Sequence, residues 1–155
     1  MTFDTHREID VRSLQRFILG ATLALLCTTA VAEEHAYKEG PVMNVYSIRT
    51  APGKFDEYMN FLDTIWKATQ ESAKKAGYVE NYKVVKVEPR SENDPDVYLI
   101  VYYKNWAALD DATAKADALA KATEGSLSAA NDSTVNRAPI RRILGSWTGQ
   151  QLDLK

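Results

Sequence analysis

The order of hydrophobic patterns along residues 42–147 limits most strongly what this chain can fold into. Residues 42–50 are rich in β-branched and aromatic side chains and stop at Pro52-Gly53, which indicates a strand. Over residues 54–76 the apolar side chains recur at spacings of three and four, which is typical of one face of a helix. Acidic residues stand in the first turn of this segment and lysines in the last, and each sign matches the helix dipole. The sequence therefore predicts a strand followed by a long amphipathic helix.

Two further strands are predicted after this helix. Residues 79–88 and 97–104 are rich in Val, Ile and Tyr, and a polar loop that contains prolines separates them. Such a pair is most simply antiparallel. The second run is apolar at nearly every position, so we expect it in the middle of the sheet with both faces covered.

A second helix and a fourth strand complete the pattern. Residues 106–123 are rich in alanine and place apolar residues on one stripe, which predicts a helix that ends near Gly125. Residues 140–147 predict the last strand, and residues 148–155 are expected to form a tail. The polar residues 126–139 are compatible with a loop or with one more short helical turn.

This order predicts an α+β fold, namely a ferredoxin-like βαββαβ sandwich with a four-stranded antiparallel sheet and two helices on one face. The second face of a nearly continuous apolar strand would then meet water. A partner sheet is the simplest cover for it, so we expect a homodimer formed through the open face.

The chain resembles the dimeric α/β-barrel superfamily over residues 42–147. The resemblance rests on the order of elements, on the Pro52-Gly53-Lys54 turn before a helix that carries Phe55, Tyr58 and Trp66, and on the strand VYLIVYY followed by Lys104-Asn105-Trp106. It implies two ferredoxin-like sheets packed face to face, with a cavity inside each protomer. Members of the superfamily include cofactor-poor monooxygenases, haem-degrading enzymes, isomerases and lactonases.

The first 32 residues have the layout of a secretory signal peptide. Three arginines precede the uncharged residues 17–31, and a small-x-small triplet ends at Ala32. The apolar stretch is shorter than the roughly 20 residues that a membrane span requires. We therefore expect cleavage near Ala32, a periplasmic or secreted protein without a membrane anchor, a flexible segment over residues 33–41 and one domain over residues 42–155.

Cleavage would remove the only cysteine and leave His35 as the only histidine. This excludes a cysteine nucleophile, a thiolate or multi-histidine metal site and an ordinary Ser-His-Asp triad, unless the segment around His35 folds back over the core. The new terminus Glu33-Glu34-His35 leaves open a Cu(II) chelate through its third-position imidazole. Otherwise we expect no metal and no cofactor, and a net charge of -2 argues against nucleic-acid binding.

The candidate ligand-binding residues come mainly from alternation along the strands. On residues 42–50 the aliphatic set Met43 and Val45 suits the helix side, which would turn Asn44 and Tyr46 into the barrel. The complete set of candidates is Asn44, Tyr46, Tyr82, Tyr98, Tyr102, Trp106, Arg142 and Trp147. Aromatic walls with a few polar tips suit a small hydrophobic or aromatic ligand. The alternative is that these tyrosines only pack in the dimer interface.

Two functions follow from these residues. The preferred one is an exported homodimeric protein that binds a small molecule or serves as a structural module. The alternative is a cofactor-free monooxygenase-like or isomerase-like enzyme that uses Asn44, Tyr46, Tyr102 and Trp106. Asn44 resembles the strand asparagine of the haem-degrading members, but neither predicted helix offers a histidine for haem iron.

A small basic cluster near the last strand is a further feature. Arg137, Arg141 and Arg142 stand close together in an acidic protein. They could meet an anionic ligand, but we expect them to pair with carboxylates.

Overall fold

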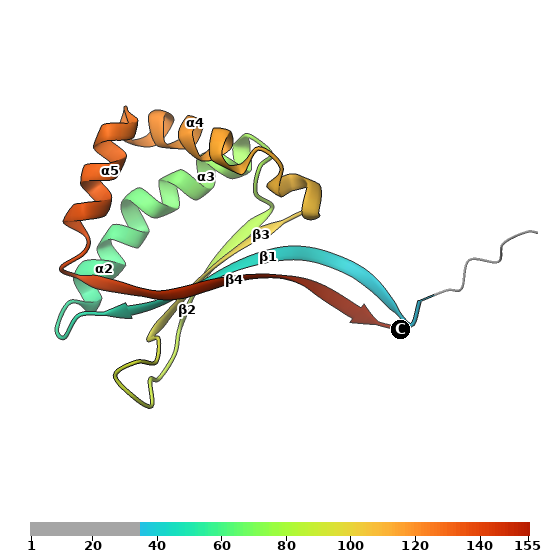
Figure 1. The fold of residues 1–155 in the computed structure, drawn as a ribbon, viewed down its shortest axis with the longest axis horizontal. Helices are drawn as coiled ribbons and strands as arrows, with labels where there is room; N and C mark the ends of the chain where they lie inside the picture. The colour runs from blue at the N-terminus through green and yellow to red at the C-terminus, as the bar shows by residue number, and fades with distance from the viewer. Residues whose placement is uncertain (1–34) are drawn as a thin grey trace, which may run out of the picture. The chain divides into compact units, whose positions relative to one another are not determined.

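The structure is a computed structural model that describes residues 35–155. It is an α+β fold with one open four-stranded antiparallel sheet in the order β2-β3-β1-β4 (Figure 1). The strands are β1 (Tyr37–Thr50), β2 (Asn81–Lys86), β3 (Val97–Tyr103) and β4 (Arg141–Leu154). The predicted signal peptide lies outside the described residues. Within residues 35–155, no helix has the length and hydropathy to cross a membrane.

The first helical segment is continuous, as predicted, but it changes type in the middle. It consists of α2 (Phe55–Phe61), the π-helical turn η1 (Leu62–Trp66) and α3 (Lys67–Lys75). The Thr64 hydroxyl donates to the Asn60 carbonyl at 2.8 Å. Such a side-chain bond competes with the backbone for the carbonyl and accompanies local distortion of a helix.

The second helical segment differs from the prediction of one helix over residues 106–123. The 3-10 helix η2 (Trp106–Leu109) is separated from α4 (Ala112–Glu124) by Asp110 and Asp111. Asp111 has a φ of 55°, which is the left-handed conformation, so the helix cannot continue through it. The Lys115 ammonium donates to the carbonyls of Ala108 and Asp110, which the break leaves without helical partners.

A third helix, α5 (Leu127–Asn136), occupies the region that the sequence left open. Ser126 caps its first turn, because the Ser126 hydroxyl accepts a hydrogen bond from the Ala129 N–H at 3.1 Å. The sheet is therefore covered by three helices on one face and not by two.

The outer strands extend further than predicted. β1 begins at Tyr37 and β4 continues to Leu154, and these two ends pair with each other. Residues 37–41, expected to be flexible, and residues 148–154, expected to be a tail, are therefore strand. Neither end has a clear strand pattern in its own sequence. Its strand conformation therefore depends on pairing with a segment about 110 residues away.

The core lies between the sheet and the helices. The main cluster joins the strand residues Ile48, Val97 and Leu99 to the helix residues Tyr58 and Leu62. A smaller cluster forms around Ala73, Val79 and Val101. β3 lies inside the sheet, as predicted, and its alternate residues Val97, Leu99 and Val101 are buried.

Candidate functional site

Strand register places three of the predicted site residues on the helix-covered face. Directly opposed residues of antiparallel strands share a face. Asn44 pairs with Val101, Tyr46 pairs with Leu99, and Tyr82 also pairs with Val101. Because Leu99 and Val101 are core residues, all three side chains point toward the helices.

Four other predicted residues lie on the opposite, open face. Tyr98, Tyr102, Trp147 and Arg142 pair respectively with Ser47, Met43, Val45 and Arg49. The expectation of a single cavity that combines Asn44 and Tyr46 with Tyr98 and Tyr102 is therefore wrong. The error comes from placing the aliphatic residues Met43 and Val45 on the helix side of the sheet. In the structure these two residues lie on the open face.

The proposed enzymatic set is not assembled either. Tyr102 lies on the face opposite to Asn44 and Tyr46. Trp106 lies in η2, where its indole N–H donates to the Gln150 side-chain oxygen at 3.0 Å. Gln150 in turn donates to the Gly40 carbonyl at 3.2 Å, so Trp106 is tied to the paired ends of β1 and β4.

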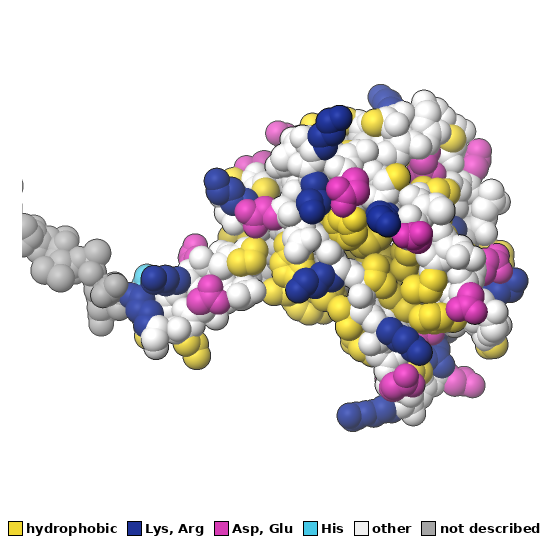
Figure 2. Space-filling model, turned by 180° about the vertical axis from the view of Figure 1, so that it is seen from behind, with side chains coloured by type: hydrophobic (Ala, Val, Ile, Leu, Met, Phe, Trp, Pro, Cys, Tyr) yellow, Lys and Arg dark blue, Asp and Glu magenta, His cyan; other side chains and the backbone are white. Residues whose placement is uncertain are grey.

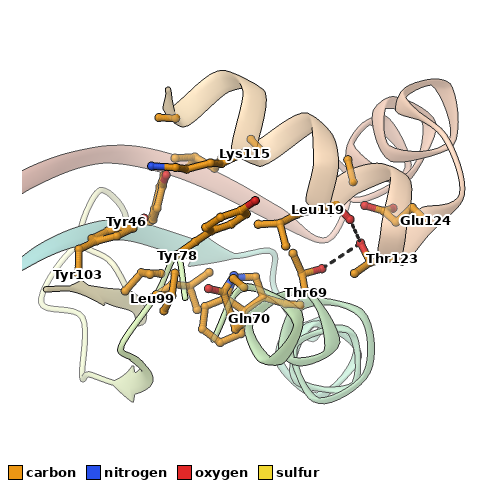
Figure 3. A pocket seen from close by; sticks show the side chains of 18 of the residues that line it. Tyr46, Thr69, Gln70, Tyr78, Leu99, Tyr103, Lys115, Leu119, Thr123 and Glu124 are labelled. Carbon is orange, nitrogen blue, oxygen red and sulfur yellow. Dashed lines mark hydrogen bonds between the residues drawn. The ribbon is translucent and has the colours of Figure 1, made fainter. Parts of the chain in front are cut away.

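The structure instead forms a cavity of about 370 Å³ between the helix-covered face and the helices (Figure 3). Its size is within the range of about 300–1,000 Å³ that is usual for small-molecule sites. β1, β3 and the start of β4 form its floor, and the helical segment α2-η1-α3, η2, α4 and Arg137 directly after α5 contribute to its walls. Its large apolar and aromatic residues include Ile48, Tyr58, Phe61, Trp66, Leu99 and Leu119.

Of the predicted site residues, only Tyr46 lines this cavity. Asn44 supports it by donating to the Tyr46 hydroxyl at 3.2 Å. Tyr82 packs edge-on against Trp66 with ring centroids 5.2 Å apart. The Tyr82 hydroxyl donates to Glu71 at 2.6 Å, and this hydrogen bond raises the pKa of Tyr82. Asn44 and Tyr82 thus help to hold the cavity wall without lining the cavity.

One end of the cavity gathers hydroxyl groups and an ammonium group. Figure 3 shows Tyr46, Tyr103 and the Lys115 ammonium at this end, with Tyr78 beside them. Lys115 Nζ lies 5.7 Å from the centroid of the Tyr78 ring. Burial raises the pKa of Tyr103, and the neighbouring Tyr46 raises it further. Tyr103 therefore stays a neutral hydrogen-bond donor at physiological pH.

Two arginines, Arg137 directly after α5 and Arg141 at the start of β4, also line the cavity. The Arg137 guanidinium lies 4.3 Å from the Phe61 ring centroid and donates to the hydroxyls of Ser133 and Thr134. Arg137 Nε is buried and has no hydrogen-bond partner. Burial lowers the pKa of Arg137, and the charge of Arg141 lowers it further.

The expectation that this basic cluster pairs with carboxylates is wrong for both cavity arginines. Among residues 35–155, neither Arg137 nor Arg141 forms an ion pair. Arg142 points to the other face and donates to the Glu92 carbonyl and the Asn93 side chain, both at 3.3 Å. The cluster is visible in the sequence, but only the fold brings Arg137 and Arg141 to one cavity and turns Arg142 away from it.

No metal cluster is available in the part of the chain that the structure describes, since no three His, Cys, Asp or Glu side chains are grouped there to hold an ion. The Cu(II) chelate at Glu33-Glu34-His35 lies mostly outside the described residues, which begin at His35.

Little similarity links the chain to known proteins. No family model matches the chain, and no curated protein matches it. One solved structure, HapK from Hahella chejuensis, is similar, with 13% sequence identity and a TM-score of 0.49. The match covers 71% of this chain and 91% of that chain. At this level of similarity the match assigns neither a fold nor a function to the chain.

Proposed function

We propose that the protein binds a small, mostly apolar molecule in the cavity between its sheet and its helices. The cavity of about 370 Å³, with its aromatic and aliphatic walls, is the observation that carries this proposal. Apolar walls supply the binding free energy, and a few polar groups fix the orientation of the ligand. Tyr46 and Tyr103 are such groups at one end, and Arg137 and Arg141 provide charge elsewhere on the wall.

Filling the cavity from α4 tests this proposal. Ala116 and Ala118 are both exposed on α4, but Ala116 lines the cavity and Ala118 does not. We expect Ala116→Phe to weaken binding of the neutral fluorescent probe N-phenyl-1-naphthylamine by roughly tenfold or more. The added ring occupies space that the probe needs, and overpacking of this kind costs about 1–3 kcal/mol. Ala118→Phe should bind the probe as the wild type does. Fluorescence titration measures both affinities.

Two results would contradict the proposal. The first is a wild-type protein that does not bind the probe. The second is an Ala116→Phe protein that is folded by circular dichroism and binds the probe as tightly as the Ala118→Phe control.

We also propose that the strands and helices form a ferredoxin-like sandwich, that residues 1–32 are a cleaved signal peptide, and that two protomers associate through the open face. The strand order β2-β3-β1-β4 supports the first point. Tyr98, Tyr102 and Trp147 support the third, because they lie on the open face and Trp147 remains 53% exposed. Figure 2 shows hydrophobic side chains gathered on the surface between the helices and the β2–β3 loop, with charged side chains around them.

Native mass spectrometry tests the last two points together. We expect a dimer whose subunit mass corresponds to a chain that begins at Glu33. Trp147→Asp should shift the protein toward monomer, because a buried unpaired carboxylate disfavours the interface. A wild-type protein that remains monomeric at micromolar concentration would contradict the homodimer, and an intact leader would contradict cleavage.

A further inference from the structure

The cavity wall carries more positively charged side chains than negatively charged ones. Lys115, Arg137 and Arg141 are basic, and Glu124 is the acidic residue that lines the cavity with them. The wall therefore carries three positive charges against one negative charge. Charges beside an apolar cavity lose part of their hydration, and this loss is costly unless a counter-charge or hydrogen bonds replace it.

Lys115 is already satisfied by the protein. Its ammonium group donates to the carbonyl of Ala108 at 3.0 Å and also to the carbonyl of Asp110. The Tyr78 ring lies on another side of this ammonium at 5.7 Å. The need for a counter-charge is therefore greatest at Arg137, since the neighbouring Arg141 also has a side-chain hydrogen bond with Tyr58.

Arg137 is only partly satisfied. Its two terminal nitrogens donate to hydroxyl groups on its own helix, and Nε remains buried without a partner. Arg141 lies close enough for its charge to disfavour the charged form of Arg137. Glu124 acts in the opposite direction but forms no ion pair with either arginine among the described residues.

We propose that Arg137 and Arg141 bind the carboxylate of an apolar acid whose aromatic or aliphatic body fills the cavity. Planar guanidinium groups match a carboxylate with paired, charge-assisted hydrogen bonds. One carboxylate beside both arginines would reduce their mutual repulsion and supply the missing counter-charge. The inference rests on the proposed function and names the chemical class of the ligand for that cavity.

A pair of ligands that differ only in charge tests the inference. 1-Naphthaleneacetate and 1-naphthaleneacetamide have the same apolar body, and each can be measured by displacement of N-phenyl-1-naphthylamine at pH 7. We expect the acid to bind about tenfold more tightly than the amide, as a charge-assisted hydrogen bond allows. Arg137→Gln and Arg141→Gln should remove this preference, and Arg90→Gln, at an exposed loop position, should retain it.

A variant that binds the acid more tightly provides a control, because a misfolded protein would lose affinity and not gain it. Glu124→Gln removes the carboxylate on the cavity wall, so it should strengthen binding of the acid several-fold relative to binding of the amide. Equal affinity for acid and amide in the wild type would overturn the inference, and so would a preference for the acid that persists in both cavity-arginine variants. In either case, binding of the probe would still support the proposed function. Failure of the wild type to bind the probe would overturn both.

Discussion

Replacing Tyr58 with alanine is expected to lower the free energy of unfolding by about 3–5 kcal/mol, the usual cost of removing a large buried aromatic side chain. Tyr58 is 1% exposed and belongs to the cluster that joins the helical segment to β1 and β3. Its ring stacks on Phe61 with centroids 5.9 Å apart. Equilibrium denaturation in urea, followed by circular dichroism, measures the loss.

The same helical segment provides the control for Tyr58→Ala. Ile65 is 40% exposed, so Ile65→Ala should cost less than about 1 kcal/mol. Tyr58→Phe keeps the ring and removes only the hydroxyl group, so its cost should fall between those of the two alanine variants. Equal stability losses for Tyr58→Ala and Ile65→Ala would show that this cluster is not the centre of the core.

Asp96→Ala is expected to destabilise the protein by about 2 kcal/mol through unsatisfied hydrogen-bonding groups. The two carboxylate oxygens of Asp96 accept from the Thr50 backbone N–H at 3.0 and 3.2 Å, and one of them also accepts from the Thr50 hydroxyl. Thr50 is only 8% exposed, so water cannot readily replace the lost acceptor. Denaturation in urea measures this loss as well.

Two further variants separate this effect from a general loss of negative charge. Asp94→Ala removes an acceptor from the exposed Arg90 N–H and should change stability by less than about 1 kcal/mol. Thr50→Val in the Asp96→Ala background removes the orphaned hydroxyl and should recover part of the loss. If Asp96→Ala is as stable as Asp94→Ala, the Thr50–Asp96 contact does not stabilise the fold.

Local patterns predicted the strands and the first helix because each depends mainly on its own periodicity. The break at Asp110 and Asp111 had no such signal, since the alanine-rich pattern continues through it. Its left-handed residue is accommodated by Lys115, which donates to the freed carbonyls from the following helix. The outer halves of β1 and β4 were missed for a similar reason, because only their pairing with each other makes them strands.

The site was harder to predict than the fold. Alternation of side chains along a strand separates the two faces of the sheet but does not say which face the helices cover. Hydrophobicity assigned Met43 and Val45 to the helix side, but that side contains a cavity and therefore accepts Tyr46. Lys115 and Tyr103 carried no local signal, because they meet only after α4 packs over β3. Arg137 and Arg141 were visible as a cluster, whereas the absence of a paired carboxylate depends on tertiary packing.

The long pairing of β1 with β4 brings the described chain back to where it starts. The Lys155 N–H donates to the Ala36 carbonyl at 3.1 Å. A short covalent link between these two residues would turn the described domain into a ring without bending the sheet. New ends could then be opened in the polar loop between β2 and β3, and the same strands would meet the same neighbours. The described domain is therefore suited to circular permutation, in which the chain ends move while the packing of the strands and helices stays the same.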